Sequence, residues 1–225
     1  MPKFSQKLSF TPEITHKIYG LISKIDELKG QWKMGVNLSP QTLGILKKSV
    51  IITSSGASTR IEGARLTDKQ VEKLLKGLKI QKLITRDEQE VAGYAELLAN
   101  VFDSYKKLEL SENTIKHFHG ELLKYSQKDI RHRGEYKSSS NRVEARDESG
   151  NVVGVLFDPT PPYLVGKEMN ELLSTTKDLL NKKEIHPLIV IGGFIFEFLS
   201  IHPFQDGNGR ASRVLTNLLL LKNGY

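Results

Sequence analysis

The apolar stretch from Ile185 to Ile201 constrains the fold of this chain more than any other feature. A proline, a glycine pair and a glutamate interrupt it, at Pro187, Gly192-Gly193 and Glu197. The stretch therefore falls short of the roughly 18 uninterrupted apolar residues that indicate a membrane-spanning helix. We interpret it as a helix buried in a protein core, and we expect no membrane partner.

Apolar residues elsewhere recur mostly at the three- and four-residue spacing of amphipathic helices. Thr11-Pro12 and Ser39-Pro40 each place a capping residue before a proline at the first helical position. Thr67 and Thr85 each open a capping box. The predicted helices run from Thr11 to near Gly30, from Ser39 to a break at Ser54-Ser55-Gly56, onward from Thr67 and from Thr85, from Glu112 to Tyr125, from Tyr163 to Leu180, and over Val214 to Leu221.

One region departs from this helical pattern. Between Asn141 and Phe157, apolar residues alternate with polar ones, a turn-like segment follows at 148–151, and the next six residues are of extended type. We predict a single β-hairpin at about 141–157. The predicted fold class is therefore all-α with one β-hairpin.

The composition excludes several classes of function. The chain has no cysteine, which excludes a disulfide scaffold, a cysteine nucleophile and any cysteine-based zinc or iron–sulfur site. Its 33 Lys and Arg against 26 Asp and Glu give a net charge of +7, but the basic residues are scattered among acidic ones. Nucleic acid is therefore a disfavoured partner. The segment Met1–Lys7 lacks the apolar region of a secretory signal, which predicts a cytoplasmic protein.

The segment from His202 to Arg213 carries the residues that point to a chemistry. It lies between the predicted buried helix and a second apolar run, as a loop that leads into a helix. A helix N-terminus offers unpaired N–H groups, and Gly207 and Gly209 let a phosphate approach the backbone closely. Arg210 and Arg213, three residues apart, lie on one helix face and can meet the same polyphosphate.

Two further residues of this segment suit catalysis. Asp206 supplies a hard oxygen ligand for Mg²⁺, which takes one or two carboxylates together with phosphates and water. His202 is a candidate general base, because the unperturbed pKa of histidine lies near neutrality. Singly, each residue has an ordinary explanation as a helix cap, a helix stop, a turn or a solvated face. Together, a base, an acid, glycines and paired arginines favour a nucleotide-phosphate site.

The segment resembles the Fic (filamentation induced by cAMP) family signature His-Pro-Phe-x-Asp/Glu-Gly-Asn-Gly-Arg-x-x-Arg and matches it at every specified position. The resemblance implies adenylylation, the transfer of AMP from ATP to a protein hydroxyl with release of pyrophosphate. It implies that His202 deprotonates the target Ser, Thr or Tyr, and that Asp206 holds Mg²⁺ between the α- and β-phosphates. By the same resemblance, the phosphates are cradled by Gly207, Asn208 and Gly209 and contacted by Arg210 at the β-phosphate region and Arg213 at the γ-phosphate.

A second segment resembles the inhibitory motif Ser/Thr-x-x-x-Glu-Gly/Asn of the family's class II members. Ser58 to Gly63 matches this motif and precedes the active-site motif in the chain. The resemblance implies an inhibitory helix at about 54–63. Glu62 would reach Arg213 and occupy the space of the γ-phosphate, while Ser58 helps to hold the helix, so that the ground state is autoinhibited.

The hairpin at about 141–157 resembles the family's flap, on whose edge a target protein docks by strand addition. Lys137 is a departure, because the family often has arginine there. The resemblance implies a Fic domain over 39–225, with its active-site loop and helix at 202–213, and leaves 1–38 as an N-terminal helical addition. Family members usually continue past the motif helix, so we expect the chain to be a piece of a longer one.

Other interpretations remain open. A Fic-fold enzyme could instead transfer phosphate, UMP or phosphocholine, or remove AMP from a modified protein. Gly209 disfavours phosphate transfer, for which the family typically has lysine at this position. A regulatory or nucleic-acid-binding module is the alternative from another class. His117 and His119 lack an acidic partner at zinc-ligand spacing, which favours a core or capping role. The target protein, auto-modification and a homo-oligomer are left open.

Overall fold

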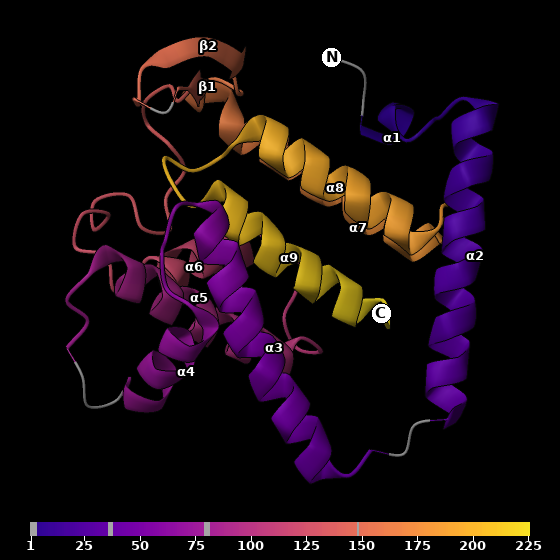
Figure 1. Ribbon diagram of the computed structural model, residues 1–225. Helices are drawn as coiled ribbons and strands as arrows, with labels where there is room; N and C mark the ends of the chain where they lie inside the picture. The colour runs from indigo at the N-terminus through magenta and orange to yellow at the C-terminus, as the bar shows by residue number, and fades with distance from the viewer. Residues whose placement is uncertain (1–3, 36–37, 79–81, 148) are drawn as a thin grey trace.

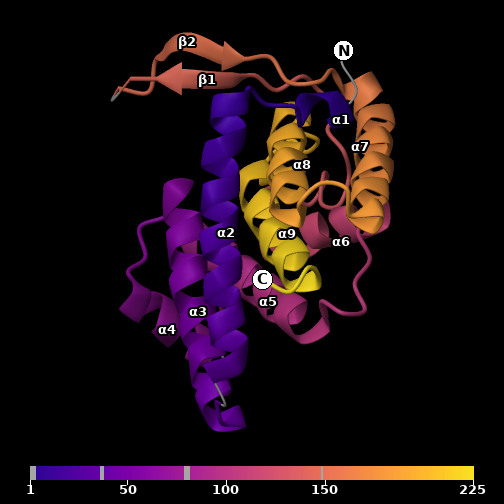
Figure 2. The same ribbon diagram turned by 90° about the vertical axis from the view of Figure 1, so that its right-hand side faces the viewer.

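The computed structural model describes residues 4–35, 38–78, 82–147 and 149–225. Within them the chain folds into packed helices with one two-stranded hairpin (Figures 1 and 2). The elements are, in order, α1 (Phe4–Lys7), α2 (Pro12–Gly35), α3 (Pro40–Ile61), α4 (Asp68–Gly77), α5 (Arg86–Ser104), α6 (Glu112–Leu122), β1 (Val143–Arg146), β2 (Val152–Phe157), α7 (Pro162–Lys182), α8 (Pro187–Ile201) and α9 (Asn208–Lys222). The predicted fold class, all-α with one β-hairpin, is confirmed.

Several helices begin at the capping residues that the sequence indicates. The Ser39 hydroxyl accepts a hydrogen bond from the Thr42 N–H at the start of α3. Thr67 and Thr85 form complete capping boxes, in which the side chain three residues later also accepts from the N–H of the cap. These bonds satisfy N–H groups that have no partner inside the helix, and they fix where α3, α4 and α5 start.

The apolar stretch that was predicted to be buried forms α8, which packs against both α7 and α9. Its buried residues are Val190, Ile191, Phe194, Phe198 and Ile201. On its other sides α9 contacts α5 and α6, so that α8 and α9 share one hydrophobic core with these helices. Among the described residues, no helix combines the length and the apolar character that a bilayer crossing requires.

The break predicted at Ser54-Ser55-Gly56 is wrong, because α3 continues without interruption to Ile61. The buried residues of α3 are small: Ser55, Gly56, Ser58 and Thr59. The Ser55 hydroxyl donates to the carbonyl of Ile51 one turn earlier, at 2.6 Å, which satisfies a buried polar group without opening the helix. These residues therefore form a packing face, against neighbours that include α4 and α5, rather than a turn.

The N-terminal helix α2 extends past the predicted end at Gly30 and lies beside the ends of α8 and α9 (Figures 1 and 2). Asp26 on α2 accepts a hydrogen bond from the Tyr225 hydroxyl at 2.7 Å and lies 3.1 Å from Nε2 of His186. The Lys29 ammonium lies 3.4 Å from the centre of the Tyr225 ring. These contacts join α2 to the residues that precede α8 and follow α9.

The hairpin pairs β1 with β2 in antiparallel register, with Val143 opposite Phe157. Its second strand exposes Val152, Val153 and Val155 to solvent. In Figure 1 the hairpin lies at the end of the bundle where α8 leads into α9. The Phe157 ring, at the end of β2, lies edge-on to the His202 ring with 6.2 Å between their centres. The hairpin thus borders the loop that carries the candidate catalytic residues.

The close approach of α5 and α6 generates a stability prediction. A Cβ on Gly93 of α5 would lie 2.2 Å from the Leu122 carbonyl oxygen of α6. We expect Gly93→Ala to lower the free energy of unfolding by about 2–3 kcal/mol, because the backbones must separate. The measurement is urea denaturation followed by far-UV circular dichroism.

The matched control is Gly166→Ala in α7, where a Cβ meets nothing within 4 Å. This change should raise the stability by about 0.5–1 kcal/mol, because alanine favours helix over glycine. Equal effects of the two substitutions would contradict the close contact between α5 and α6.

Candidate active site

His202 is placed by the C-terminus of α8. It adopts the left-handed backbone conformation (φ 52°, ψ 61°), which is uncommon for a residue with a side chain and re-aims the chain toward the loop. Its N–H donates to the Phe198 carbonyl at 3.0 Å. Its Nδ1 lies 3.2 Å from the Leu199 carbonyl, which can only accept, so Nδ1 carries the proton and Nε2 is the basic nitrogen.

The surroundings of His202 keep its ring neutral. Burial lowers the pKa of His202 below its ordinary value, the hydrogen bond to Leu199 works in the opposite direction, and the charge of Lys137 lowers it further. The neutral tautomer with Nε2 unprotonated is the form that a general base requires. His202 can therefore accept a proton from a hydroxyl that approaches on its Nε2 side.

The loop between α8 and α9 is closed by the Asn208 side chain. Its Oδ1 accepts the Phe204 N–H at 2.9 Å, and its Nδ2 donates to the Phe204 carbonyl at 2.7 Å. Asn208 is buried, so its side chain is committed to the loop, and only its backbone N–H can contribute to the predicted phosphate cradle. Gly207 caps α9 with φ 79°, a conformation that glycine adopts without strain.

The His119 side chain of α6 packs against the loop between α8 and α9. Its ring stacks on Phe204 with 3.8 Å between centres and 4° between planes. The Gly134 N–H donates to Nδ1 at 3.0 Å, so Nε2 carries the proton and donates to the Asp206 carbonyl at 3.0 Å. Burial lowers the pKa of His119 to about 4, so the ring stays neutral. The predicted core role of His119 agrees with this burial, whereas His117 is exposed, so a core role is wrong for that residue.

Asp206 and Arg210 form the charged centre of the site. Oδ1 of Asp206 accepts the Gly207 N–H at 2.5 Å and lies 3.3 Å from Nη2 of Arg210. Burial by itself would raise the pKa of Asp206, but Arg210, the Gly207 N–H and Arg86 together lower it, so the carboxylate is ionised. Arg210 is buried and also pairs with Glu90 of α5 at 3.1 Å. Its Nε and Nη1 are buried without a hydrogen-bond partner among the described residues, so two donors of this guanidinium are unsatisfied.

The donor set at Asp206 fits one kind of metal binding. Across 4–35, 38–78, 82–147 and 149–225, no group of three or more His, Asp or Glu side chains could hold a metal by itself. Mg²⁺ at nucleotide sites takes one or two carboxylates and completes its shell with phosphate oxygens and water. A single ionised carboxylate beside a helix N-terminus therefore fits a Mg²⁺ ion that arrives with phosphates.

Arg213 contacts the second motif rather than the partners of Arg210. Its Nε donates to the Ser58 hydroxyl at 2.6 Å, and its Nη2 donates to the Ser58 carbonyl at 3.0 Å and to Oε1 of Glu62 at 2.8 Å. A Cβ on Gly209 would lie 2.5 Å from the same Glu62 oxygen. The C-terminal end of α3 is thus held on the first two turns of α9, and the two sequence motifs meet at one guanidinium.

Four residues near the site were missing from the sequence-based set: Arg86, Glu90, Lys137 and Asn141. Glu90 forms an ion pair with Arg210. The sequence pattern that could have indicated Glu90 is its spacing of four residues from Arg86 on a predicted helix, which allows an ion pair between the two. Lys137, noted as a departure, donates to the Ile201 carbonyl at 3.2 Å and to Asn141 at 2.7 Å, so it caps the end of α8 next to His202. Asn141 in turn donates to the Phe204 carbonyl at 2.9 Å.

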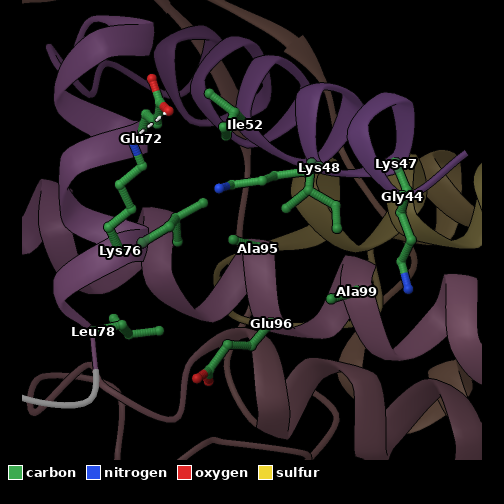
Figure 3. Close-up of a pocket in the computed structure, with 12 residues that line it drawn as sticks. Gly44, Lys47, Lys48, Ile52, Glu72, Lys76, Leu78, Ala95, Glu96 and Ala99 are labelled. Carbon is green, nitrogen blue, oxygen red and sulfur yellow. Dashed lines mark ion pairs between the residues drawn. The ribbon is translucent and has the colours of Figure 1, made fainter. Parts of the chain in front are cut away.

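Two of the cavities that border α3 differ in their relation to the candidate site. One, of about 260 Å³, is lined by Ser58, Tyr94, Arg213 and Asn217 among others, and so borders the contact between the motifs. The other, of about 360 Å³, lies between α3, α4 and α5. In Figure 3 it is bordered by Ala95 and Ala99 of α5 and by the Glu72–Lys76 ion pair of α4. Its lining includes no residue of 202–213, so it is separate from the candidate active site.

Comparison with known proteins places this geometry in a family. Residues 109–220 match the model of the Fic/DOC family. The crystal structure of a Fic-domain-containing signalling protein from Bacteroides thetaiotaomicron superposes with a TM-score of 0.75 at 26% identity, covering 89% of this chain and 73% of that one. A Fic family protein from Desulfovibrio desulfuricans superposes with a TM-score of 0.69 at 30% identity, covering 94% of this chain and 58% of that one.

Among curated relatives, a probable protein adenylyltransferase from Aquifex aeolicus is 40% identical over 75 residues. That match covers 32% of this chain and 22% of the relative. The chain thus matches only part of the relative's length.

The tautomer and burial of His202 generate a pH prediction. We expect the NMR titration of the His202 ring to have its midpoint below the ordinary value of 6.5, because burial and then Lys137 disfavour the protonated form. Lys137→Gln should move the midpoint upward, since it removes a positive neighbour. The resonance is assigned by its loss in His202→Ala. A midpoint at or above 6.5 would contradict the described environment.

Proposed function

Because residues 109–220 of this chain form a Fic/DOC family domain, we propose that the protein is an adenylyltransferase that moves AMP from ATP to a hydroxyl of a target protein. The observation that carries the proposal is the tautomer of His202. Its Nδ1 is tied to Leu199, so its Nε2 is basic, and it precedes by a few residues the ionised Asp206 and the N-terminus of α9. The name of the curated relative supports the same activity.

The proposed reaction has one covalent step. The target hydroxyl oxygen attacks the α-phosphorus of ATP, the bond from that phosphorus to the pyrophosphate oxygen breaks, and pyrophosphate leaves. The hydroxyl proton passes to Nε2 of His202. Because Leu199 holds the other ring nitrogen, the imidazole keeps its orientation and its charge is partly stabilised after it accepts the proton.

The phosphate chain binds at the N-terminus of α9 in this proposal. Gly207 caps α9 without a side-chain hydrogen bond, which leaves the first N–H groups of the helix for an anion, and Arg210 supplies a buried positive charge. Asp206 would hold Mg²⁺, which when bound neutralises charge on the phosphates. Positioning and neutralisation are what transfer at phosphorus chiefly requires from a protein.

We further propose that Glu62 keeps this site inactive. Arg213 is engaged by Ser58 and Glu62, so a γ-phosphate that needs the same guanidinium must first displace a carboxylate of like charge. In this proposal the target segment pairs with an exposed strand edge of the hairpin. That edge lies near His202, because the Phe157 ring at the end of β2 lies edge-on to the His202 ring. A cytoplasmic location remains a prediction, and the target protein and auto-modification stay open.

The test is incorporation of label from ATP labelled at the α-phosphate into the protein itself. We expect Glu62→Gly to raise incorporation at least tenfold over wild type, since removal of a like charge and of occupied volume is worth about 1.4 kcal/mol or more. Label at the γ-phosphate should not be incorporated, because it leaves with pyrophosphate.

The control is the double variant Glu62→Gly with His202→Ala. It should bind ATP but incorporate no label, because the general base is missing. Incorporation of the γ-label would favour phosphate transfer over AMP transfer. Incorporation that survives the loss of His202 would remove this residue from the mechanism.

A further inference from the structure

Four charged side chains from two helices and a loop form a closed ring at the candidate active site. Nε of Arg86 lies 2.6 Å from Oε1 of Glu90, and Oε2 of Glu90 lies 3.1 Å from Nη1 of Arg210. Nη2 of Arg210 lies 3.3 Å from Oδ1 of Asp206, and Oδ2 of Asp206 lies 3.6 Å from Nη2 of Arg86. Positive and negative groups alternate around the ring, so its net charge is zero.

The ring has a buried side and an open side. The side chains of Glu90 and Arg210 are 7% and 2% exposed. Those of Arg86 and Asp206 are 59% and 38% exposed. Arg86 is the first residue of α5, outside both motifs, and its exposed side chain is free to change partners while the buried pair stays in place.

The two oxygens of Asp206 have different surroundings. Oδ1 accepts hydrogen bonds from the Gly207 N–H and from Nη2 of Arg210. In the part of the chain that the structure describes, Oδ2 accepts no hydrogen bond, and its ion-pair partner is the Arg86 guanidinium, at 3.6 Å. Oδ2 is therefore the oxygen that an incoming cation can reach, and Arg86 is the charge that the cation meets there.

We propose that Arg86 makes divalent-cation binding at Asp206 conditional on a bound triphosphate. This inference rests on the proposed function, in which Asp206 is the carboxylate for the cation. A lone cation at Oδ2 meets the positive charges of Arg86 and Arg210, with that of Lys128 also acting on Asp206. Its affinity is therefore low.

A triphosphate reverses this balance. It brings negative charge to the open side of the ring, so that Arg86 gains a phosphate partner and no longer opposes the cation. The cation and the nucleotide then bind together, and by thermodynamic linkage each strengthens the other. The site would remain empty of cation until ATP arrives, which prevents a lone ion from occupying Asp206.

The experiment measures Mn²⁺ binding by electron paramagnetic resonance without nucleotide. We expect Arg86→Gln to bind Mn²⁺ about tenfold more tightly than wild type, the scale of one unit charge at this distance. Arg86→Lys, which keeps the charge, should bind as wild type does. Arg65→Gln is the matched control, since it removes an exposed arginine that lies outside the ring and whose backbone N–H donates to Asp87, the residue after Arg86.

Two further measurements complete the test. Adding Asp206→Asn to Arg86→Gln should abolish the gain. With an ATP analogue whose α–β bridge is a methylene group, wild type should bind Mn²⁺ tightly and the difference from Arg86→Gln should shrink.

The proposal is overturned if Arg86→Gln binds Mn²⁺ no more tightly than wild type and Arg65→Gln, or if the gain survives Asp206→Asn. No transfer of AMP enters this measurement. A Glu62→Gly protein that shows the expected Mn²⁺ binding but transfers nothing would therefore contradict the proposed function alone.

Discussion

The arrangement of the candidate active site depends on one buried side-chain amide. Asn208 binds both the N–H and the carbonyl of Phe204, and this closes the loop between α8 and α9. With the loop closed, Gly207 is held in the left-handed conformation and the Phe204 ring stacks on His119. The closed loop then holds His202, at the end of α8, close to the first residues of α9. Without those bonds, the base and the anion-binding N–H groups would have no fixed relation.

Each arginine of the motif is paired with a carboxylate from another helix, but the two pairs differ in burial. Arg210 and Glu90 are both buried, so breaking their ion pair would strand a charge in the core, and the pair acts as a permanent part of the fold. Arg213 and Glu62 are partly exposed, so their ion pair is weak and an anion can replace the carboxylate. This difference suits a structural role for the first pair and a regulatory role for the second.

Local signals in the sequence were sufficient for much of the fold. The caps at Ser39, Thr67 and Thr85 are formed where they were predicted, since a cap depends on residues within one turn. The break at Ser54-Ser55-Gly56 was wrong, because small residues that can end a helix can also pack one closely, and only the tertiary contacts decide. The same reason applies to the candidate site. The residues of 202–213 were predicted from their own spacing and from the family resemblance, and their roles stay a prediction. Glu90 and Arg86 act on Arg210 and Asp206 across more than a hundred residues, which no local pattern encodes.

The central claim is that Glu62 competes with the third phosphate of ATP for Arg213. Isothermal titration with Mg²⁺ present tests it most directly, by comparing ATP and ADP binding to His202→Ala with and without Glu62→Gly, because His202→Ala prevents turnover. We predict that Glu62→Gly strengthens ATP binding about tenfold and ADP binding by less than about twofold, since ADP lacks the phosphate that needs Arg213. An equal gain for both nucleotides, or a gain for neither, would contradict the claim.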